Sequence, residues 1–192
     1  MSNPNHLLTQ LSEGKKEAYT ALIDTYESKI YNFAYRMVEN KYDAEDITQE
    51  TFIRIIEKAR DLSTRDEMNL SAYTYKVAKN LTLNEIERKK KEKASDTLEK
   101  EDLNVYQDPE RALLLKEQIQ KTRRVSQDLS EGHRLALTLK ELQGLTYQEM
   151  SEVMGMTKTN IGVFLLRARL KFKEAYMMSE ISQESLSVLD RI

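Results

Sequence analysis

The sequence of 192 residues contains no cysteine and no tryptophan, and it holds only two prolines and five glycines. Without cysteine, the chain can have no disulfide, no thiol nucleophile and no cysteine-ligated zinc. No apolar stretch approaches the roughly 20 residues that a membrane-spanning helix needs. Residues 1–11 also lack the basic segment and apolar run of a secretory signal. These absences predict a cytoplasmic protein.

The sequence is also poor in groups that carry out catalysis. Its two histidines, His6 and His133, lie far apart, and no carboxylates stand near them at metal-ligand spacing. No glycine-rich phosphate loop is present. We therefore expect no catalytic residue, no metal, no cofactor and no small-molecule substrate, and we do not expect an enzyme.

What the sequence does contain favours helices. Charged residues make up 32% of the chain and hydrophobic residues 40%, with many Glu, Lys and Leu side chains that lose little freedom in a helix. Apolar residues recur at helical spacing over residues 19–38, 44–59 and 70–86. Residues 40–43 resemble a helix break, and the polar residues 61–69 are predicted to form a loop. This pattern predicts a first helical bundle, with residues 1–94 as its domain.

A second group of helices is predicted after a charged, aperiodic segment. Residues 95–108 are expected to form a flexible acidic linker, and Pro109 suits the first turn of a new helix. Helical segments are predicted over residues 111–125, 130–143, 146–154 and 157–178, with Gly144 and Gly155 as left-handed C-cap residues. Residues 109–178 form the second domain, and residues 179–192 are a tail that could form a short helix. The predicted fold class is all-α, with an N-terminal helical bundle and a C-terminal helix-turn-helix domain.

Charge is distributed unevenly although the formal net charge is only −2. Between Ser71 and Lys93 there are seven basic and three acidic residues, and Arg167, Arg169, Lys171 and Lys173 form a second basic group. Acidic residues separate the two groups. This arrangement suits a protein that binds a polyanion at two places. Ordinary solvated helix faces are an equally good explanation of the charges alone.

The segment from Leu145 to Thr157 predicts a helix-turn-helix. Thr146 and Glu149 have the spacing of a capping box, and Gly155 separates the two helices. The early exposed residues of the second helix of such a motif enter a DNA major groove. The candidate duplex contacts are Lys158, Thr159, Asn160, Val163 and Arg167, of which Arg167 is better placed for phosphate. A packing role without DNA remains the alternative for this motif.

A further candidate surface lies on the helix that begins near Asp43. The face opposite its apolar stripe carries Asp46, Gln49, Glu50, Ile53 and Glu57. An isoleucine among acids and an amide indicates a protein-docking surface. A single exposed apolar residue can also have no function.

Three segments together resemble one protein family. Residues 43–53 (DAEDITQETFI), residues 71–81 (SAYTYKVAKNL) and the helix-turn-helix are similar, in order and spacing, to the extracytoplasmic-function (ECF) sigma factors of bacterial RNA polymerase. The resemblance covers roughly residues 7–178. It implies that the chain directs core RNA polymerase to promoter DNA, and that an anti-sigma factor or another regulator is a partner. It also implies that Asp43, Asp46, Gln49, Glu50 and Ile53 bind the coiled coil of the largest polymerase subunit.

The resemblance assigns the other two segments to promoter DNA. The helix from Leu70 and the loop before it would read the minus-ten element as a single strand, with a flipped base held by the loop. The candidate contacts are Tyr73, Tyr75, Lys76, Lys79, Asn80 and Arg88, although Tyr73 could instead belong to the core. The second domain would bind the minus-thirty-five element as duplex and touch the polymerase flap.

The sequence departs from the family pattern most clearly in the recognition helix. Family members tend to have polar or basic residues where this chain has Gly162, Val163, Phe164 and Leu166. We therefore expect binding of the minus-thirty-five element to be weak, unusual in sequence, or assisted by a partner that covers Phe164. An alternative function is a sigma-like decoy that binds an anti-sigma factor without initiating transcription. A simple helix-turn-helix repressor would leave the segment from Asp43 unexplained.

Overall fold

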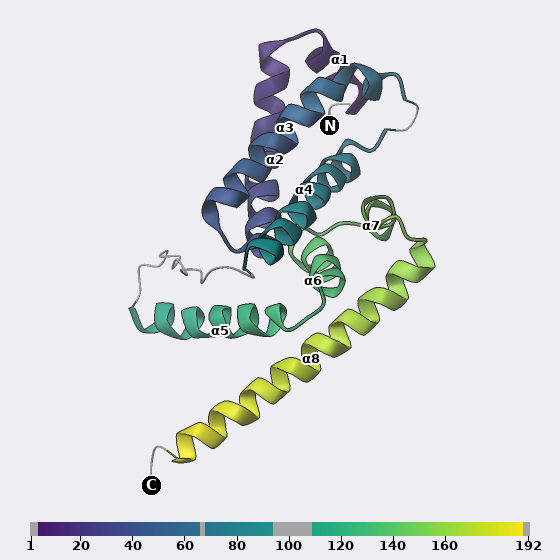
Figure 1. Ribbon diagram of the computed structural model, residues 1–192. Coiled ribbons are helices and arrows are strands. Elements are labelled where there is room, and N and C mark those ends of the chain that lie inside the picture. The colour runs from purple at the N-terminus through teal and green to yellow at the C-terminus, as the bar shows by residue number, and fades with distance from the viewer. Residues whose placement is uncertain (1–3, 66–67, 94–108, 190–192) are drawn as a thin grey trace.

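The computed structural model describes residues 4–65, 68–93 and 109–189, and it describes side chains over residues 6–65, 68–92 and 118–179. Its elements, shown in Figure 1, are α1 (Pro4–Ser12), α2 (Lys16–Val38), α3 (Lys41–Ser63), α4 (Leu70–Lys93), α5 (Pro109–Gln127), α6 (Glu131–Leu137), the π-helical turn η1 (Thr138–Leu142), α7 (Tyr147–Met154) and α8 (Lys158–Leu189). Every element in these ranges is helical, which confirms the predicted all-α class. The predicted linker, residues 95–108, lies outside the described residues.

The first half is a bundle in which α2, α3 and α4 pack against one another. Helix α2 ends where Glu39 adopts a left-handed conformation (φ 56°), and its N–H donates to the carbonyl of Tyr35. Asn40 then caps α3, because its side-chain oxygen accepts a hydrogen bond of 3.1 Å from the N–H of Asp43. The predicted break at residues 40–43 is therefore confirmed.

Two features of this bundle differ from expectation. Helix α1 was not anticipated, and it packs against α3 by burying Leu8 and Leu11. Helix α3 continues to Ser63, so the predicted loop over residues 61–69 begins too early. The helix extends because Leu62 is buried in the core, although its neighbours are polar.

The second half contains the predicted helix-turn-helix, formed by α7 and α8. Thr146 and Glu149 make the capping box, with the N–H of Glu149 donating to the Thr146 hydroxyl at 3.2 Å. Gly155 ends α7 in a left-handed conformation (φ 67°), and the Ser151 hydroxyl donates to the carbonyl of Met156 at 2.5 Å. The Thr157 hydroxyl then accepts from the N–H of Asn160. These local bonds fix the turn between the two helices.

The helix predicted over residues 130–143 contains a π turn. From Thr138 to Leu142 the ladder widens, so that the N–H of Gln143 donates to the carbonyl of Thr138 at 3.1 Å. Such turns are rare and shift the side chains that follow them. Here the turn contacts α2, and the Thr138 hydroxyl lies 3.9 Å from the sulfur of Met37.

Helix α8 is one continuous helix of 32 residues. The prediction of a break near residue 178 and a separate short helix is wrong, because the backbone stays helical to Leu189. No glycine or proline follows Gly162, so nothing in the backbone chemistry forces the helix to end earlier. Residues 190–192 lie outside the described residues.

The two halves pack on each other and share one hydrophobic core. Helix α4 lies against α7 (Figure 1), and α2 contacts the π turn. The buried members of this shared core from the first half are Ile30, Phe33, Met37, Ala72, Tyr75 and Ala78, and those from the second half are Leu135, Ala136, Leu139, Leu145, Met150, Val153, Ile161 and Leu165. The prediction that residues 1–94 and residues 109–178 are two separate domains, each able to fold by itself, stays a prediction.

Candidate docking and nucleic-acid surfaces

The outer face of α3 carries the side chains that the sequence assigned to protein docking. Asp46 and Gln49 are exposed, and Ile53 has 49% of its surface accessible. Glu50 is half-buried and accepts a bond of 2.7 Å from the guanidinium of Arg54, one turn away. The face therefore presents an acid, an amide and an isoleucine to solvent.

The fifth residue of this predicted set has a different environment. Asp43 is half-buried and forms an ion pair with Lys89 of α4, so it ties two helices of the bundle together. Tyr42, which the sequence interpretation missed, has 64% of its surface exposed. Its position four, seven and eleven residues before Asp46, Gln49 and Ile53 puts it on the same face. This spacing was a signal available in the sequence.

The predicted minus-ten residues on α4 divide into two groups. Lys76 and Asn80 are exposed and lie one turn apart, so they face solvent together. Arg88 is exposed, and its guanidinium forms ion pairs of 2.5 Å with Glu85 and Glu92. Its partners hold the pKa of Arg88 above its ordinary value, led by the hydrogen bonds to Glu85 and Glu92.

The remaining residues of that set face inward. Tyr73 is half-buried and packs against the core beneath α1 and α3. This position agrees with the alternative prediction that Tyr73 belongs to the core and does not contact DNA. Tyr75 has only 2% of its surface exposed, and its ring packs edge-on against Phe33 at 5.8 Å. Tyr75 is covered in this packed arrangement of the chain, so its contact with DNA stays a prediction for a form in which the two halves separate.

Tyr75 and Lys79 instead connect α4 to the second half. The Tyr75 hydroxyl donates to the side-chain oxygen of Gln143 at 2.9 Å, and the Lys79 ammonium donates to the carbonyl of Val153 at 2.9 Å. Burial, reinforced by Tyr26 and Glu149, raises the pKa of the Tyr75 hydroxyl. Burial, with a smaller contribution from the charge of Lys76, lowers the pKa of Lys79. Both shifts mark groups taken out of water at this interface.

Further polar contacts surround the same interface. Lys90 pairs with Glu131. Glu39 forms an ion pair with Arg123 (3.1 Å) and accepts a hydrogen bond from Gln127. Ser71 and Asn69, at the start of α4, lie across the interface from the carboxylate of Glu149 and help to lower its pKa. Partial burial would raise the pKa of Glu149, but the hydrogen bonds from Thr146 and across the interface outweigh it and lower the pKa.

The recognition helix α8 begins with polar residues and continues with apolar ones. Lys158, Thr159 and Asn160 are exposed, as is Arg167, which has no ion pair in the described part of the chain. Val163 and Leu166 are also exposed, at 47% and 56% of their surfaces. Arg169 is less available, because its guanidinium is bonded to Glu141 at 2.6 Å.

Phe164 does not need an external partner to cover it, contrary to expectation. Its ring packs against the imidazole of His133 at 4.8 Å between centroids. A Cβ atom at Gly132 would lie 3.2 Å from the Phe164 ring, so glycine at this position makes room for the aromatic side chain. Phe164 is therefore part of the packing between α6 and α8.

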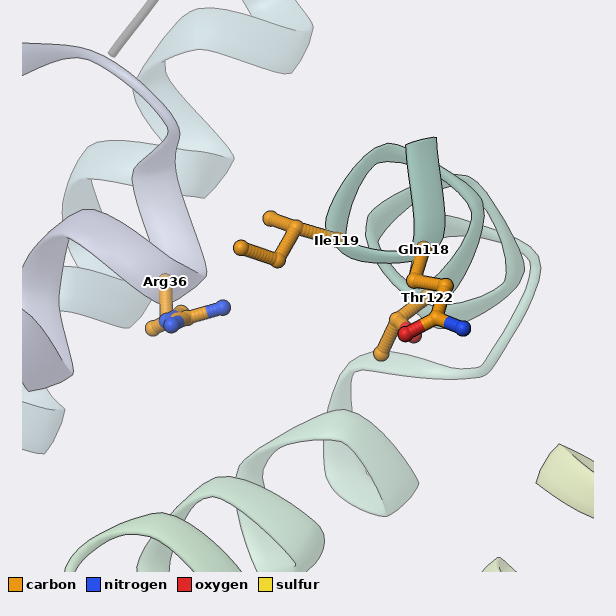
Figure 2. A pocket seen from close by; sticks show the side chains of 4 residues that line it. All are labelled: Arg36, Gln118, Ile119 and Thr122. Carbon is orange, nitrogen blue, oxygen red and sulfur yellow. The ribbon is translucent and has the colours of Figure 1, made fainter. Parts of the chain in front are cut away.

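The described residues show no constellation suited to catalysis. They include no group of three or more His, Cys, Asp or Glu side chains that could hold a metal. A cavity of about 220 Å³ between α2 and α5 is lined by Arg36, Gln118, Ile119 and Thr122 (Figure 2), none of which is an acid or a histidine. Among the described helices, none has the length and apolarity to cross a membrane.

Comparison with known proteins assigns both halves of the chain. Residues 22–92 match the model of Sigma-70 region 2, and residues 119–172 match that of Sigma-70, region 4. The chain is 30% identical over 179 residues to the ECF RNA polymerase sigma factor SigW of Bacillus subtilis, covering 85% of this chain and 95% of that protein. It is 31% identical over 153 residues to SigM of the same organism, covering 79% and 90%.

Solved structures share the fold. The structure of CnrH in complex with the cytosolic domain of CnrY aligns with a TM-score of 0.65 at 18% identity, over 88% of this chain and 94% of that one. The sigma factor RpoE in complex with the anti-sigma factor NepR from Bartonella quintana aligns with a TM-score of 0.63 at 21% identity, over 82% and 95%. With two sigma regions in order and 30% identity to SigW over 85% of its length, the chain belongs to the ECF sigma factors of RNA polymerase.

Proposed function

We propose that this ECF sigma factor binds core RNA polymerase through the outer face of α3 and promoter DNA through α4 and α8, and that the packed arrangement is its resting form. As a sigma factor it directs the polymerase to promoters and is not itself an enzyme. We place its work in the cytoplasm, where the polymerase transcribes.

The polymerase-binding proposal rests on the chemistry of the α3 face. Tyr42, Asp46, Gln49 and Ile53 lie on one side of the helix and are exposed. An aromatic and an isoleucine give apolar contact area, and the acid and amide fix orientation through hydrogen bonds and charge. Such a face suits a partner helix with apolar and basic side chains. We include Glu50 in the contact and assign Asp43 to holding α3 on α4.

The promoter proposal begins with the exposed side of α4. Lys76 and Asn80 can contact the backbone and base edges of a single strand, and Arg88 stands two turns further along. At α8, Lys158, Thr159 and Asn160 are placed to enter a major groove with Arg167 on phosphate. The apolar Val163 reduces the polar contacts that this helix can make with bases.

The proposal that the packed arrangement is a resting form rests on the contact between the two halves of the chain. Helix α4 packs directly against α7, which covers Tyr75 and engages Lys79. The minus-ten and minus-thirty-five elements are separate stretches of the promoter, and each base pair between them adds roughly 3.4 Å along the duplex. A chain with its two halves in contact cannot reach both. Fifteen residues, 94–108, join the two halves, and a chain of that number of residues can span at most roughly 50 Å, which allows the halves to separate.

Reconstituted transcription tests this function. Core polymerase with the purified chain should start transcription at discrete promoters, and the Asp46→Ala, Ile53→Ala double variant should lose that activity while keeping its helical circular dichroism. The matched control Lys58→Ala changes an exposed residue on another side of α3 and should remain active. Transcripts that begin only at DNA ends or at random positions would refute the proposal.

A role for an anti-sigma factor is a related proposal. The neighbours CnrH and RpoE were solved with CnrY and with the anti-sigma factor NepR. A regulator that bridges the two halves of this chain would stabilise the resting form and keep Tyr75 and Lys79 covered. A decoy that only binds such a regulator would share this closed form, but it would not stimulate promoter-specific transcription in the reconstituted assay.

A further inference from the structure

Helix α8 carries an apolar stripe on the side that faces away from its own core. Ile161, Leu165 and Ala168 point inward and are fully buried. On the opposite side, Val163, Leu166, Leu170 and Met177 recur at intervals of three, four and seven residues, and 47–56% of each side chain is exposed. Lone exposed apolar residues are ordinary, but four on one stripe of a single helix mark a surface that a partner covers.

Other apolar and aromatic side chains of α8 are engaged within the chain, so the stripe is its open apolar side. Helix α5 packs against α8, with the ammonium of Lys121 at 4.4 Å from the centre of the Tyr176 ring. Phe172 and Tyr176 stack on each other at 6.0 Å on that side. Arg169 is held by Glu141. Figure 1 shows α8 along one edge of the molecule, where a second helix could lie beside it.

The charges along α8 are strongly divided between its two halves. Residues 158–173 contain five basic side chains and no acidic one, whereas residues 174–189 contain three glutamates and no basic one. A parallel copy of this helix would bring like charges together. An antiparallel copy would bring each basic half onto an acidic half.

We propose that α8 of one chain packs antiparallel on α8 of a second copy, forming a homodimer through this stripe. With the two-fold axis between Lys173 and Glu174, the two helices overlap along their whole length of about 48 Å. In that register Leu170 of each copy faces Met177 of the other, and Lys173 lies beside Glu174 of the other. A second copy is the occupant that the charges favour, because it brings Leu170 onto Met177 and Lys173 beside Glu174. Glu174 also pairs with Lys171 of its own helix at 3.7 Å, but its side chain stays 65% exposed.

The dimer and duplex DNA would compete for the same side of α8. Val163 belongs to the stripe, and Thr159 and Arg167 lie beside it on the exposed face of the recognition helix. A chain paired in this way cannot present that face to a major groove. Dimerisation would therefore remove the minus-thirty-five surface from use, independently of the contact between α4 and α7.

Sedimentation equilibrium of the full chain across the micromolar range tests the proposal. The fitted mass should rise from the 22.4 kDa of one chain towards twice that value as the concentration increases. The Leu166→Glu, Leu170→Glu variant should remain at the mass of one chain. Ile23→Glu, which changes an exposed isoleucine of α2, is the matched control and should dimerise like the unchanged protein.

Charge exchange tests the direction of the pair and avoids the apolar positions. Lys173→Glu and Glu174→Lys should each weaken the dimer at low salt, because each puts like charges beside each other in both halves of the interface. The combined Lys173→Glu, Glu174→Lys variant restores opposite charges and should recover the original mass profile. A single-chain mass at every concentration would overturn the proposal. Loss of the dimer in the combined variant as well would overturn the antiparallel register.

Discussion

Replacing Tyr75 by Phe should make the chain bind core polymerase more tightly. The substitution removes the hydroxyl that donates to Gln143 at 2.9 Å and keeps the ring that packs on Phe33. A hydrogen bond of this kind contributes about 1 kcal/mol, which corresponds to about a fivefold change in an equilibrium constant. Gln143 is half-buried, so its amide can hydrogen-bond to water when the Tyr75 hydroxyl is removed. The bond to Tyr75 exists only in the packed form, so the substitution destabilises the packed form and not the open one.

The direction of the effect follows from the linkage between opening and binding. If the polymerase binds only the chain whose two halves are apart, the apparent Kd equals the intrinsic Kd divided by the fraction of the chain that is open. A packed form weakened by about 1 kcal/mol would lower the apparent Kd up to about fivefold. A role of Tyr75 in folding alone would not tighten binding.

The assay is a titration of fluorescently labelled chain with core polymerase, alongside urea unfolding. Tyr75→Phe should lower both the apparent Kd and the free energy of unfolding. Tyr73→Phe is the control, because the Tyr73 hydroxyl has no hydrogen-bond partner within the described ranges. An unchanged or larger Kd for Tyr75→Phe, with the fold intact, would refute the reasoning.

Three further results are expected. Asp46→Ala with Ile53→Ala should raise the Kd for core polymerase by tenfold or more. The midpoint of urea unfolding should move little, because both side chains are exposed. Co-sedimentation with polymerase equal to that of the unchanged chain would show that this surface does not bind polymerase. Lys76→Ala should slow promoter melting, measured as permanganate reactivity at the start site, and unchanged reactivity would count against its contact with DNA. The lowered pKa of Glu149 means that its ionised form stabilises the fold above about pH 4.5 and that this contribution is lost as the pH falls through the folded-state pKa. The stability advantage over Glu149→Gln should therefore be largest near neutral pH and disappear in acid, as followed by urea unfolding at each pH; a difference that does not depend on pH would contradict the assignment.

The features that the sequence predicted correctly depend on residues close together in the chain. The capping box joins Thr146 to Glu149, and Asn40 caps a helix through the N–H of Asp43, three residues away. Gly155 takes the left-handed conformation that a helix end often needs. Such interactions are set by local chemistry, so residue type and spacing are enough to locate them.

The features that the sequence did not predict depend on distant parts of the chain. Tyr75 looks like an exposed aromatic in a basic helix, but its partner Gln143 lies 68 residues further on. The π turn at Thr138–Leu142 contacts α2, about 100 residues earlier in the sequence. Helix α1 is short, and its burial of Leu8 depends on α3. Local periodicity carries no information about which helices meet.

The central claim is that a chain packed at rest separates its two halves when it joins the polymerase. Because the sequence has no cysteine, Ser28→Cys on α2 and Glu152→Cys on α7 can carry spin labels without other changes. Pulsed electron paramagnetic resonance should give one short distance for the free chain and a clearly longer one in the complex with core polymerase. The same short distance in a complex that starts transcription at promoters would contradict the account.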